Sequence, residues 1–452
     1  MQPTNHQETK IHIFKALVTL SIPTILEEML ATLLQYVDTA MVGKLGENAT
    51  AAVSVTTTVT WLIGSVCSAL GIAALSLISK AVGSGDKERI RRISSHVLLL
   101  AVGCGVIVGG MAMLLSPYIP LWMGAEEAIQ KQASVYFFII SMPMVFRACN
   151  SILGASIRAT KDTRTPMFIN LSANVLNVVL NYLLIYTLGL GVMGAAVASA
   201  VSYALSGCCM FVAYRKNGLL HWEWKNFRPD GVILADCARL SIPVLATNVV
   251  SCLGYVVFAS LVTGMGTTVF AAHSIAVTAE TIFYIPGYGL RTATSTLVGI
   301  SLGEGNRRKF EHVSMLSVFL TMGMMVFSGM VLYLTAYPLM CLFTNSEQVA
   351  VIGADMLRLV AFSEPFFGLM VVMEGIYYGL GRTRYTFWVT TVSMWGVRIL
   401  FTWLCVEIWH QGLTQVWYCM IADNVCKAIL LVLPVLSVKS RRALFSSEEP
   451  VQ

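Results

Sequence analysis

The chain alternates between long apolar stretches and short polar connections. A bilayer core needs about 20 apolar residues in helical form, so each long stretch predicts a membrane-spanning helix. The stretches form two sets of six, at 14–42, 52–79, 94–117, 132–157, 166–187 and 192–214, and at 239–262, 269–298, 313–340, 350–380, 386–408 and 412–437. The pattern therefore predicts an all-α integral membrane protein with about twelve transmembrane helices.

Composition supports a membrane protein. Hydrophobic residues make up 56% of the chain and charged residues only 12%, about half of the charged fraction of soluble domains. The net charge of +6 does not indicate a nucleic-acid partner, because the basic residues form short clusters between apolar stretches. The first fifteen residues are polar and lack a small-residue cleavage site, so the first apolar stretch is predicted to be the first span.

The distribution of Lys and Arg predicts the orientation. Only Lys44 and Lys131 fall on one side of the predicted membrane. The other side carries the remaining clusters, which are Lys10, Lys15, Lys80, Lys87, Arg89, Arg91, Arg92, Arg158, Lys161, Arg164, the 215–239 segment, Arg307, Arg308, Lys309, Arg382, Arg384, Lys439, Arg441 and Arg442. We expect a multi-pass protein of a bacterial cytoplasmic (inner) membrane with both termini in the cytoplasm.

An internal repeat appears when the chain is shifted by 220 residues. At this offset Leu20-Ser21-Ile22-Pro23 meets Leu240-Ser241-Ile242-Pro243, Gly46 meets Gly266, Ala51-Ala52 meets Ala271-Ala272, Gly83 and Gly85 meet Gly303 and Gly305, and Thr163-Arg164 meets Thr383-Arg384. Each copy holds six spans, an even number, so the two copies are predicted to be parallel repeats. Repeats of this kind are typical of transporters that rock two halves for alternating access.

The repeat also predicts the domain organisation. We expect an amino-terminal six-helix lobe over 1–214, a cytoplasmic linker over 215–238, a carboxy-terminal six-helix lobe over 239–440 and a cytoplasmic tail over 441–452. Because one chain contains both lobes, a monomer would suffice for function.

Four stretches of the chain resemble the multidrug and toxic compound extrusion (MATE) family, bacterial type. They are Ile22-Pro23 through Val37-Asp38-Thr39 to Val42-Gly43-Lys44-Leu45-Gly46; Ala271-Ala272-His273; Leu297-Val298-Gly299 with Leu302-Gly303-Glu304-Gly305; and Gly379-Leu380-Gly381-Arg382-Thr383-Arg384. The family usually has Gln after the first Gly of the third stretch, where this chain has Ile300. With the repeat, the resemblance covers nearly the whole chain. It implies export of small-molecule drugs or metabolites coupled to inward Na⁺ or H⁺ flow, with membrane lipid as surroundings and no cofactor.

Asp38 is the sharpest candidate for ion coupling in the first half. It lies in the outer part of the first span, fifteen residues after Pro23, and the resemblance places the family's essential acid at this position. A carboxylate held away from water there could exchange a proton or bind Na⁺; the alternative is a structural acid bonded to neighbouring hydroxyls. Pro23 frees a backbone carbonyl and either lets the helix bend or is a tolerated kink.

The fifth span carries a stripe of amides. Asn170, Asn174, Asn177 and Asn181 are spaced by four, three and four residues, so they share one helical face. The resemblance places ion-site ligands at Asn177 and Asn181, with Ser199 at a nearby hydroxyl position; many relatives have Asp where this chain has Asn181. The alternative is interhelical hydrogen bonding, which we prefer for Asn170.

In the second half, Glu280, Glu364 and Arg398 are ionisable residues at membrane depth. Such residues cost about 2.5–3.5 kcal/mol to insert and need a partner, a cavity or a function. Either Glu280 or Glu364 binds a cation, or one of them permanently neutralises Arg398. Asp423 and Lys427, four residues apart, are expected to form a structural pair within one helix.

Aromatic side chains accompany the acids. Tyr36, Tyr255 and Tyr284 could stack an organic cation substrate, although ordinary helix packing explains them equally. Glu27 shares a helix face with Asp38, and Arg147 is a candidate counter-ion for it.

The leading hypothesis is therefore an antiporter that exports organic, preferentially cationic, compounds. Alternatives are a flippase or exporter for lipid-linked or peptide substrates, a passive channel and a membrane enzyme. The enzyme is disfavoured because the chain has no D-D-x-x-D, H-E-x-x-H, G-x-S-x-G or Walker A motif. Its eleven cysteines also match no metal-ligand spacing.

Overall fold

The computed structural model describes residues 4–220 and 230–436, and within these ranges the regular structure is entirely helical. The helices of the first half are α1 (Thr4–Gly43), α2 (Glu47–Ser84), α3 (Lys87–Leu115), α4 (Ile119–Trp122), α5 (Glu127–Ser141), α6 (Met144–Ala159), α7 (Arg164–Asn181), the π-helix η1 (Tyr182–Thr187) and α8 (Gly191–Lys216). Those of the second half are α9 (Gly231–Thr263), α10 (Thr267–Gly303), α11 (Arg307–Phe343), α12 (Glu347–Ala361), α13 (Glu364–Leu380), α14 (Thr383–Ser393), the π-helix η3 (Met394–Ile399), α15 (Leu400–Trp403), the π-helix η4 (Leu404–Ile408) and α16 (Leu413–Leu436).

These helices confirm the predicted membrane protein. Within residues 4–220 and 230–436, ten helices are long and apolar enough to cross a bilayer, and the count reaches twelve when each of two bent helix pairs is one span. Two predicted segments lie wholly or partly outside the described residues. They are the tail at 441–452, together with Lys439, and residues 221–229 of the linker. The tail includes Arg441 and Arg442.

The fourth and tenth spans are bent rather than continuous. α5 and α6 meet at 50°, and α12 and α13 meet at 56°. Pro143 lies in the first break and Pro365 follows the second, and proline removes a helical hydrogen bond and clashes with the preceding turn. The breaks, at 142–143 and 362–363, are 220 residues apart, so the sequence repeat is also a repeat of backbone geometry.

The chain forms two compact units. The amino-terminal unit is Leu26–Leu245, and the carboxy-terminal unit is Met1–Ile25 with Ala246–Gln452. Each change of unit falls two residues after a repeated proline, Pro23 or Pro243. The first part of α1 thus belongs with the second half of the chain, and the first part of α9 with the first half. The lobes predicted from the sequence, 1–214 and 239–440, are defined by the repeat and stay a prediction.

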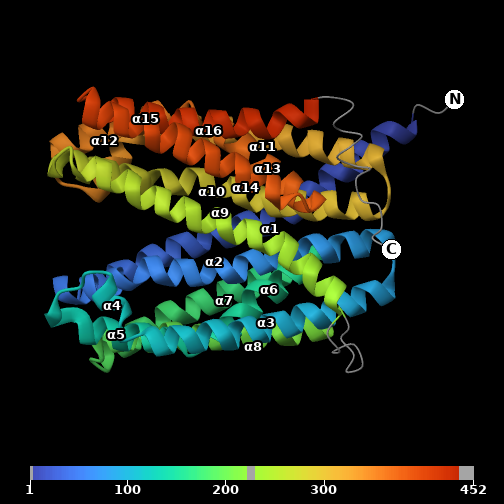
Figure 1. The fold of residues 1–452 in the computed structure, drawn as a ribbon, viewed down its shortest axis with the longest axis horizontal. Coiled ribbons are helices and arrows are strands. Elements are labelled where there is room, and N and C mark those ends of the chain that lie inside the picture. Colours follow the sequence, from blue (N-terminus) through green and yellow to red (C-terminus); the bar gives the residue numbers. More distant parts are fainter. Residues whose placement is uncertain (1–3, 221–229, 437–452) are drawn as a thin grey trace. The chain divides into compact units, whose positions relative to one another are not determined.

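Within the amino-terminal unit, α6 packs against α2, α3 and α8 (Figure 1). Its core includes Ile78, Ile152 and Leu153, which are almost fully buried. The helices approach closely at Gly207, where an added Cβ would lie 2.3 Å from the carbonyl oxygen of Phe146.

Within the carboxy-terminal unit, α10 packs against α11, α12 and α13, and α16 packs against α13. One core cluster joins Leu17 and Leu20 of α1 to Val371 and Ala428, and a second surrounds Trp417. Apolar residues of the first part of α1 are therefore core residues of this unit.

Candidate ion-coupling site

The four residues predicted for ion coupling form one hydrogen-bonded chain across three helices. The Nδ2 group of Asn181 in α7 donates to Asp38 Oδ1 in α1 and to Asn177 Oδ1, 3.2 Å away. Asn177 Nδ2 in turn donates to the Ser199 hydroxyl of α8 over 3.3 Å. The structure therefore brings together residues separated by up to 161 positions in the sequence.

The groups of this cluster leave an acceptor and a negative charge unsatisfied. Asn181 is fully buried, and its Oδ1 atom has no hydrogen-bond partner among the residues that the structure describes. In the part of the chain that the structure describes, Asp38 has no ion pair with a basic side chain. Carboxylate, amide and hydroxyl oxygens are the donors that a hard cation prefers, so the cluster suits Na⁺ as well as a proton.

At this cluster the backbone changes from α-helical to π-helical. α7 ends at Asn181 and the chain continues as the π-helix η1, where the amide of Leu188 bonds to the carbonyl of Leu183. π-helical turns inside α-helices are rare and often mark functional sites. Asn181 is the last α-helical residue before this change of winding.

The row of Asn side chains on α7 makes a second contact with α1, nearer the amino-terminal ends of both helices. Asn170 Nδ2 donates to Glu27 Oε1 of α1 over 2.5 Å. This bond agrees with the expectation that Asn170 joins two helices, and its acid partner also forms an ion pair.

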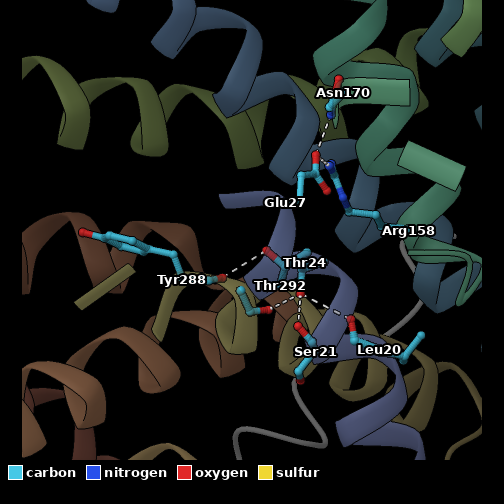
Figure 2. Close-up of polar contacts among 9 residues, drawn as sticks. Leu20, Ser21, Thr24, Glu27, Arg158, Asn170, Tyr288 and Thr292 are labelled. Carbon is cyan, nitrogen blue, oxygen red and sulfur yellow. Dashed lines mark hydrogen bonds and ion pairs between the residues drawn. The ribbon is translucent and has the colours of Figure 1, made fainter. Parts of the chain in front are cut away.

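The counter-ion of Glu27 is Arg158 and not Arg147. Arg158 Nη2 lies 2.5 Å from Glu27 Oε1 (Figure 2). Arg147 instead lies over the ring of Tyr203, 5.2 Å from its centroid, and donates to the carbonyl of Thr60. Both arginines occupy the same face of α6, eleven residues apart, because eleven residues make about three turns. The sequence therefore identified the correct face of α6 but not which of its two arginines lies level with Glu27.

In the carboxy-terminal unit, Asp423 is the centre of a buried charge cluster. Its Oδ2 atom lies 2.8 Å from Lys427 Nζ and 2.9 Å from Arg398 Nε, and the Ser393 hydroxyl donates to its Oδ1 over 2.6 Å. The predicted pair of Asp423 and Lys427 is present, with Arg398 as an additional member.

Arg398 has a direct ion-pair partner in this cluster. Among the described residues, its ion-pair partner is Asp423, and it lies over the rings of Tyr255 and Phe258 at 5.5 and 5.7 Å. Neither Glu280 nor Glu364 is within ion-pair distance of Arg398 in that part of the chain. Asp423 therefore forms the direct ion pair with Arg398, and whether Glu280 or Glu364 also balances its charge or binds a cation stays a prediction.

Glu280 and Glu364 are left as buried acids. Glu280 lies in α10 and is 8% exposed, and Glu364, at the first position of α13, is 1% exposed. Glu280 lies within electrostatic range of both Glu364 and Arg398. Within the described ranges, neither oxygen of Glu364 has a hydrogen-bond partner, which is costly for a buried polar group.

The predicted tyrosines have different surroundings. Tyr255 is exposed except for its contact with Arg398. Tyr284 packs against Phe367 at 5.0 Å and against Tyr288 at 6.0 Å. Tyr36 lies half-buried in α1, two residues before Asp38. Of the three tyrosines, Tyr255 is the one whose ring lies against a basic side chain, that of Arg398.

Sequence reasoning missed a second, partly buried ion pair. Arg291 Nη1 lies 3.2 Å from Glu374 Oε2, and its guanidinium lies over the Tyr288 ring, 4.7 Å from the centroid. Glu374 lies on a different helix, α13, so only the fold brings it next to Arg291.

Comparisons with known proteins agree with this fold. A family model described as MatE matches residues 23–183 and 243–404. A relative from Thermotoga maritima, named as a probable multidrug resistance protein NorM, is 28% identical over 96% of this chain and 95% of its own length.

Two solved structures share the fold. A transporter of the MOP superfamily from Pyrococcus furiosus matches with a TM-score of 0.89 and 24% identity over 96% of each chain. The MATE transporter VcmN from Vibrio cholerae matches with a TM-score of 0.90 and 19% identity, over 98% of this chain and 99% of that one. Both family matches begin at a repeated proline, Pro23 or Pro243.

Proposed function

The chain belongs to the MatE family of membrane transporters, and on that premise we propose that it is a secondary-active antiporter. In this proposal it exports small organic compounds, preferentially cationic ones, in exchange for inward flow of Na⁺ or H⁺ by alternating access. Membership of a transporter family makes it a transport protein and not an enzyme. We place it in the cytoplasmic membrane of a bacterium with both termini in the cytoplasm.

One observation carries the proposal. The Asp38 carboxylate, without a basic partner among the described residues, faces an amide whose buried oxygen is unsatisfied. A partly buried carboxylate without a basic partner is costly to keep charged. A transported cation or proton would neutralise it, and loss of that ion would restore the charge. A reversible charge of this kind is what an ion-coupled transporter needs.

The Asn181 amide can serve both charge states of Asp38. In the arrangement seen in the structure, its Nδ2 group donates to Asp38 Oδ1, which suits the ionised carboxylate. When Asp38 is protonated, rotation of the amide would let Oδ1 accept the carboxyl proton. When Na⁺ binds, the same rotation would give the ion an amide oxygen beside the carboxylate, with Asn177 and Ser199 adding oxygens. The site therefore fits either coupling ion without a change of residues.

We propose Glu280 and Glu364 as a second cation site, in the carboxy-terminal unit. Asp423 already neutralises part of the positive charge of Arg398 and Lys427. With Glu280 and Glu364 ionised, three acids would face two basic side chains, and one proton or cation would balance the cluster. The unpartnered oxygens of Glu364 support this role, and Tyr255 and Tyr284 remain candidates for contact with a cationic substrate.

Pro23 is proposed as the bending point of α1. Proline at this position leaves the carbonyl of Thr19 without its helical donor. Two hydroxyls next to Pro23 bond within the helix, Ser21 to the carbonyl of Leu17 and Thr24 to the carbonyl of Ser21. These bonds allow the helix to bend without exposing further backbone groups.

Transport by purified protein in liposomes tests the proposal. Export of a fluorescent cationic dye is measured under separately imposed Na⁺ and pH gradients, for the wild type and for Asp38→Asn. We expect one gradient to drive export by the wild type and not by the variant, with equal amounts of folded protein. Ser206→Ala, on α8 but outside the cluster, is the control and should transport normally. Normal export by Asp38→Asn would move coupling to Glu280 and Glu364, and no gradient-driven export of several dyes would contradict the proposal.

A further inference from the structure

Two acid–amide contacts join α1 to α7 with the same separation in sequence. Glu27 bonds to Asn170 and Asp38 bonds to Asn181, and the residue numbers differ by 143 in both pairs. Equal differences mean that the two helices run parallel in one register. The contacts are eleven residues apart on each helix, about three turns, so they lie on one face of each helix. We call them the inner contact (Glu27–Asn170) and the outer contact (Asp38–Asn181).

The two contacts differ in charge. Arg158 of α6 forms an ion pair with Glu27 in the inner contact, and the two side chains are 17% and 9% exposed. Asp38 in the outer contact has no such partner in the described part of the chain. Arg158 therefore balances the charge of Glu27 within the protein, although the Oε2 atom of Glu27 has no hydrogen-bond partner among the described residues. The charge of Asp38, in contrast, needs a transported ion.

The inner contact lies where α1 changes its surroundings. Thr24 donates to the carbonyl of Gly289 over 2.9 Å, and an added Cβ on Gly289 would lie 2.7 Å from the backbone nitrogen of Ile25. Residues up to Ile25 are thus held against α10, and the next polar side chain, Glu27, is held by α6 and α7 (Figure 2). Glu27 is the first polar anchor of the part of α1 that carries Asp38.

The ion pair at Glu27 cannot form at the corresponding positions of the other copy of the repeat. At the offset of 220, Glu27, Arg158 and Asn170 correspond to Thr247, Tyr378 and Thr390. The six-helix fold therefore forms without this ion pair. Its presence in the copy that contains Asp38 indicates a role in the site of that copy.

We propose that Glu27, Arg158 and Asn170 form a positioning site that holds α1 in register with α7 and so places Asp38 against Asn181. This inference rests on the proposed ion coupling at Asp38. A slip of α1 by one residue rotates each side chain by about 100° around the helix. Such a slip would turn Asp38 away from Asn181, so loss of the inner contact weakens binding of the coupling ion at a distance of about three turns.

The first test measures ion dependence of export in liposomes. In Glu27→Leu/Arg158→Leu the inner contact is lost but no unpaired charge remains buried, so the protein is expected to fold. We expect the half-saturating concentration of the coupling ion to rise by about 10–100-fold, as when outer partners of metal ligands are removed, with little change in the maximal rate. Asn170→Leu, which keeps the ion pair, should shift it in the same direction.

Two further variants separate positioning from general stability. Glu27→Arg/Arg158→Glu restores an ion pair, and the Asn170 amide can donate or accept, so the half-saturating concentration should return toward the wild-type value. Glu374→Gln disrupts the ion pair with Arg291 in the other unit and should leave it unchanged. An unchanged ion dependence in both Glu27→Leu/Arg158→Leu and Asn170→Leu would overturn the inference.

A second measurement does not depend on transport. Spin labels at Thr39 of α1 and Leu183 of η1, in a cysteine-free background, report the register of the two helices. We expect the distance distribution to shift or broaden in Glu27→Leu/Arg158→Leu relative to the wild-type sequence. An unchanged distribution would contradict the positioning role. Absence of ion-driven export by the wild type would contradict the proposed function instead, so the two failures can be told apart.

Discussion

At the residue scale, Asp423 shows how one acid can satisfy several buried groups. It is fully buried and contacts Lys427, Arg398 and Ser393. Two basic side chains that would each be unstable at this depth share one carboxylate, and Arg398 gains further stabilisation from Tyr255 and Phe258. This arrangement leaves Glu280 and Glu364 available for another role.

We predict that Asp423→Asn destabilises the protein strongly. Removing one member of a buried ion pair leaves uncompensated charge and costs about 3–5 kcal/mol. Ser393→Ala removes only a hydrogen bond to the same carboxylate and should cost about 1 kcal/mol. Thermal unfolding in one detergent, followed by loss of the monodisperse peak on size exclusion, compares the two. Equal stability of Asp423→Asn and wild type would show that Arg398 and Lys427 have other partners.

We predict that Glu364→Gln folds normally but changes transport. No group in the described part of the chain bonds to its carboxylate oxygens, so a neutral side chain of the same shape removes a buried charge without breaking a contact. If the proposed second cation site is correct, the variant should be as stable as the wild type and should lose cation-dependent transport. Glu374→Gln is the contrasting variant, because it removes the partner of Arg291 and should lower stability. A marked loss of stability in Glu364→Gln would indicate a structural ion pair instead.

At the element scale, close helix packing depends on particular glycines. Gly207 of α8 lies against the backbone of Phe146 in α6. Gly110 of α3, in contrast, has nothing within 4 Å of an added Cβ. Both glycines are inside helices, so their intrinsic effect on helix stability is the same and only the space differs.

We predict opposite effects for alanine at these two positions. Gly207→Ala forces α8 away from α6 and should destabilise by about 1–3 kcal/mol, as overpacking does. Gly110→Ala should be neutral or should stabilise by up to about 1 kcal/mol through helix propensity. Thermal unfolding of both variants under identical conditions provides the measurement. A stable Gly207→Ala would mean that the α6–α8 contact can widen without cost.

The membrane-spanning helices were largely predictable from the sequence, except for the bends in two of them. Each predicted span coincides with a helix or a bent helix pair, because apolar length alone decides what can cross a bilayer. The bends in the fourth and tenth spans were not predicted, although Pro143 and Pro365 lie there. Proline at membrane depth is tolerated in both straight and bent helices, since neighbouring groups can satisfy the freed carbonyl. The packing around it decides the outcome.

At the scale of the whole molecule, the two compact units exchange the first parts of α1 and α9. Leu17 and Leu20 of α1 belong to a core with residues of α10, α13 and α16. Cys237 and Leu240 of α9 belong to a core with residues of the first half. Each half of the sequence therefore completes the core of the other half.

We predict that the two halves of the chain assemble without a peptide link. Fragments 1–220 and 221–452, expressed together, should copurify through a tag on one of them. Deleting residues 1–25 from the first fragment removes a core segment of the carboxy-terminal unit and should greatly reduce the yield of the pair. Copurification at full yield without residues 1–25 would show that the exchanged segment is dispensable for assembly.

The sequence by itself determined the class of fold, the number of spans, the repeat and the family, because hydropathy and residue spacing act locally along the chain. It also identified Asp38, Asn177, Asn181 and Ser199, which the structure joins by hydrogen bonds; their role in coupling stays a proposal. Periodicity gives the face of a helix on which a residue lies, but not the depth or the neighbouring helix. For this reason only the tertiary structure decided that Arg158 pairs with Glu27, that Arg398 pairs with Asp423, and that α1 and α9 each divide between two units.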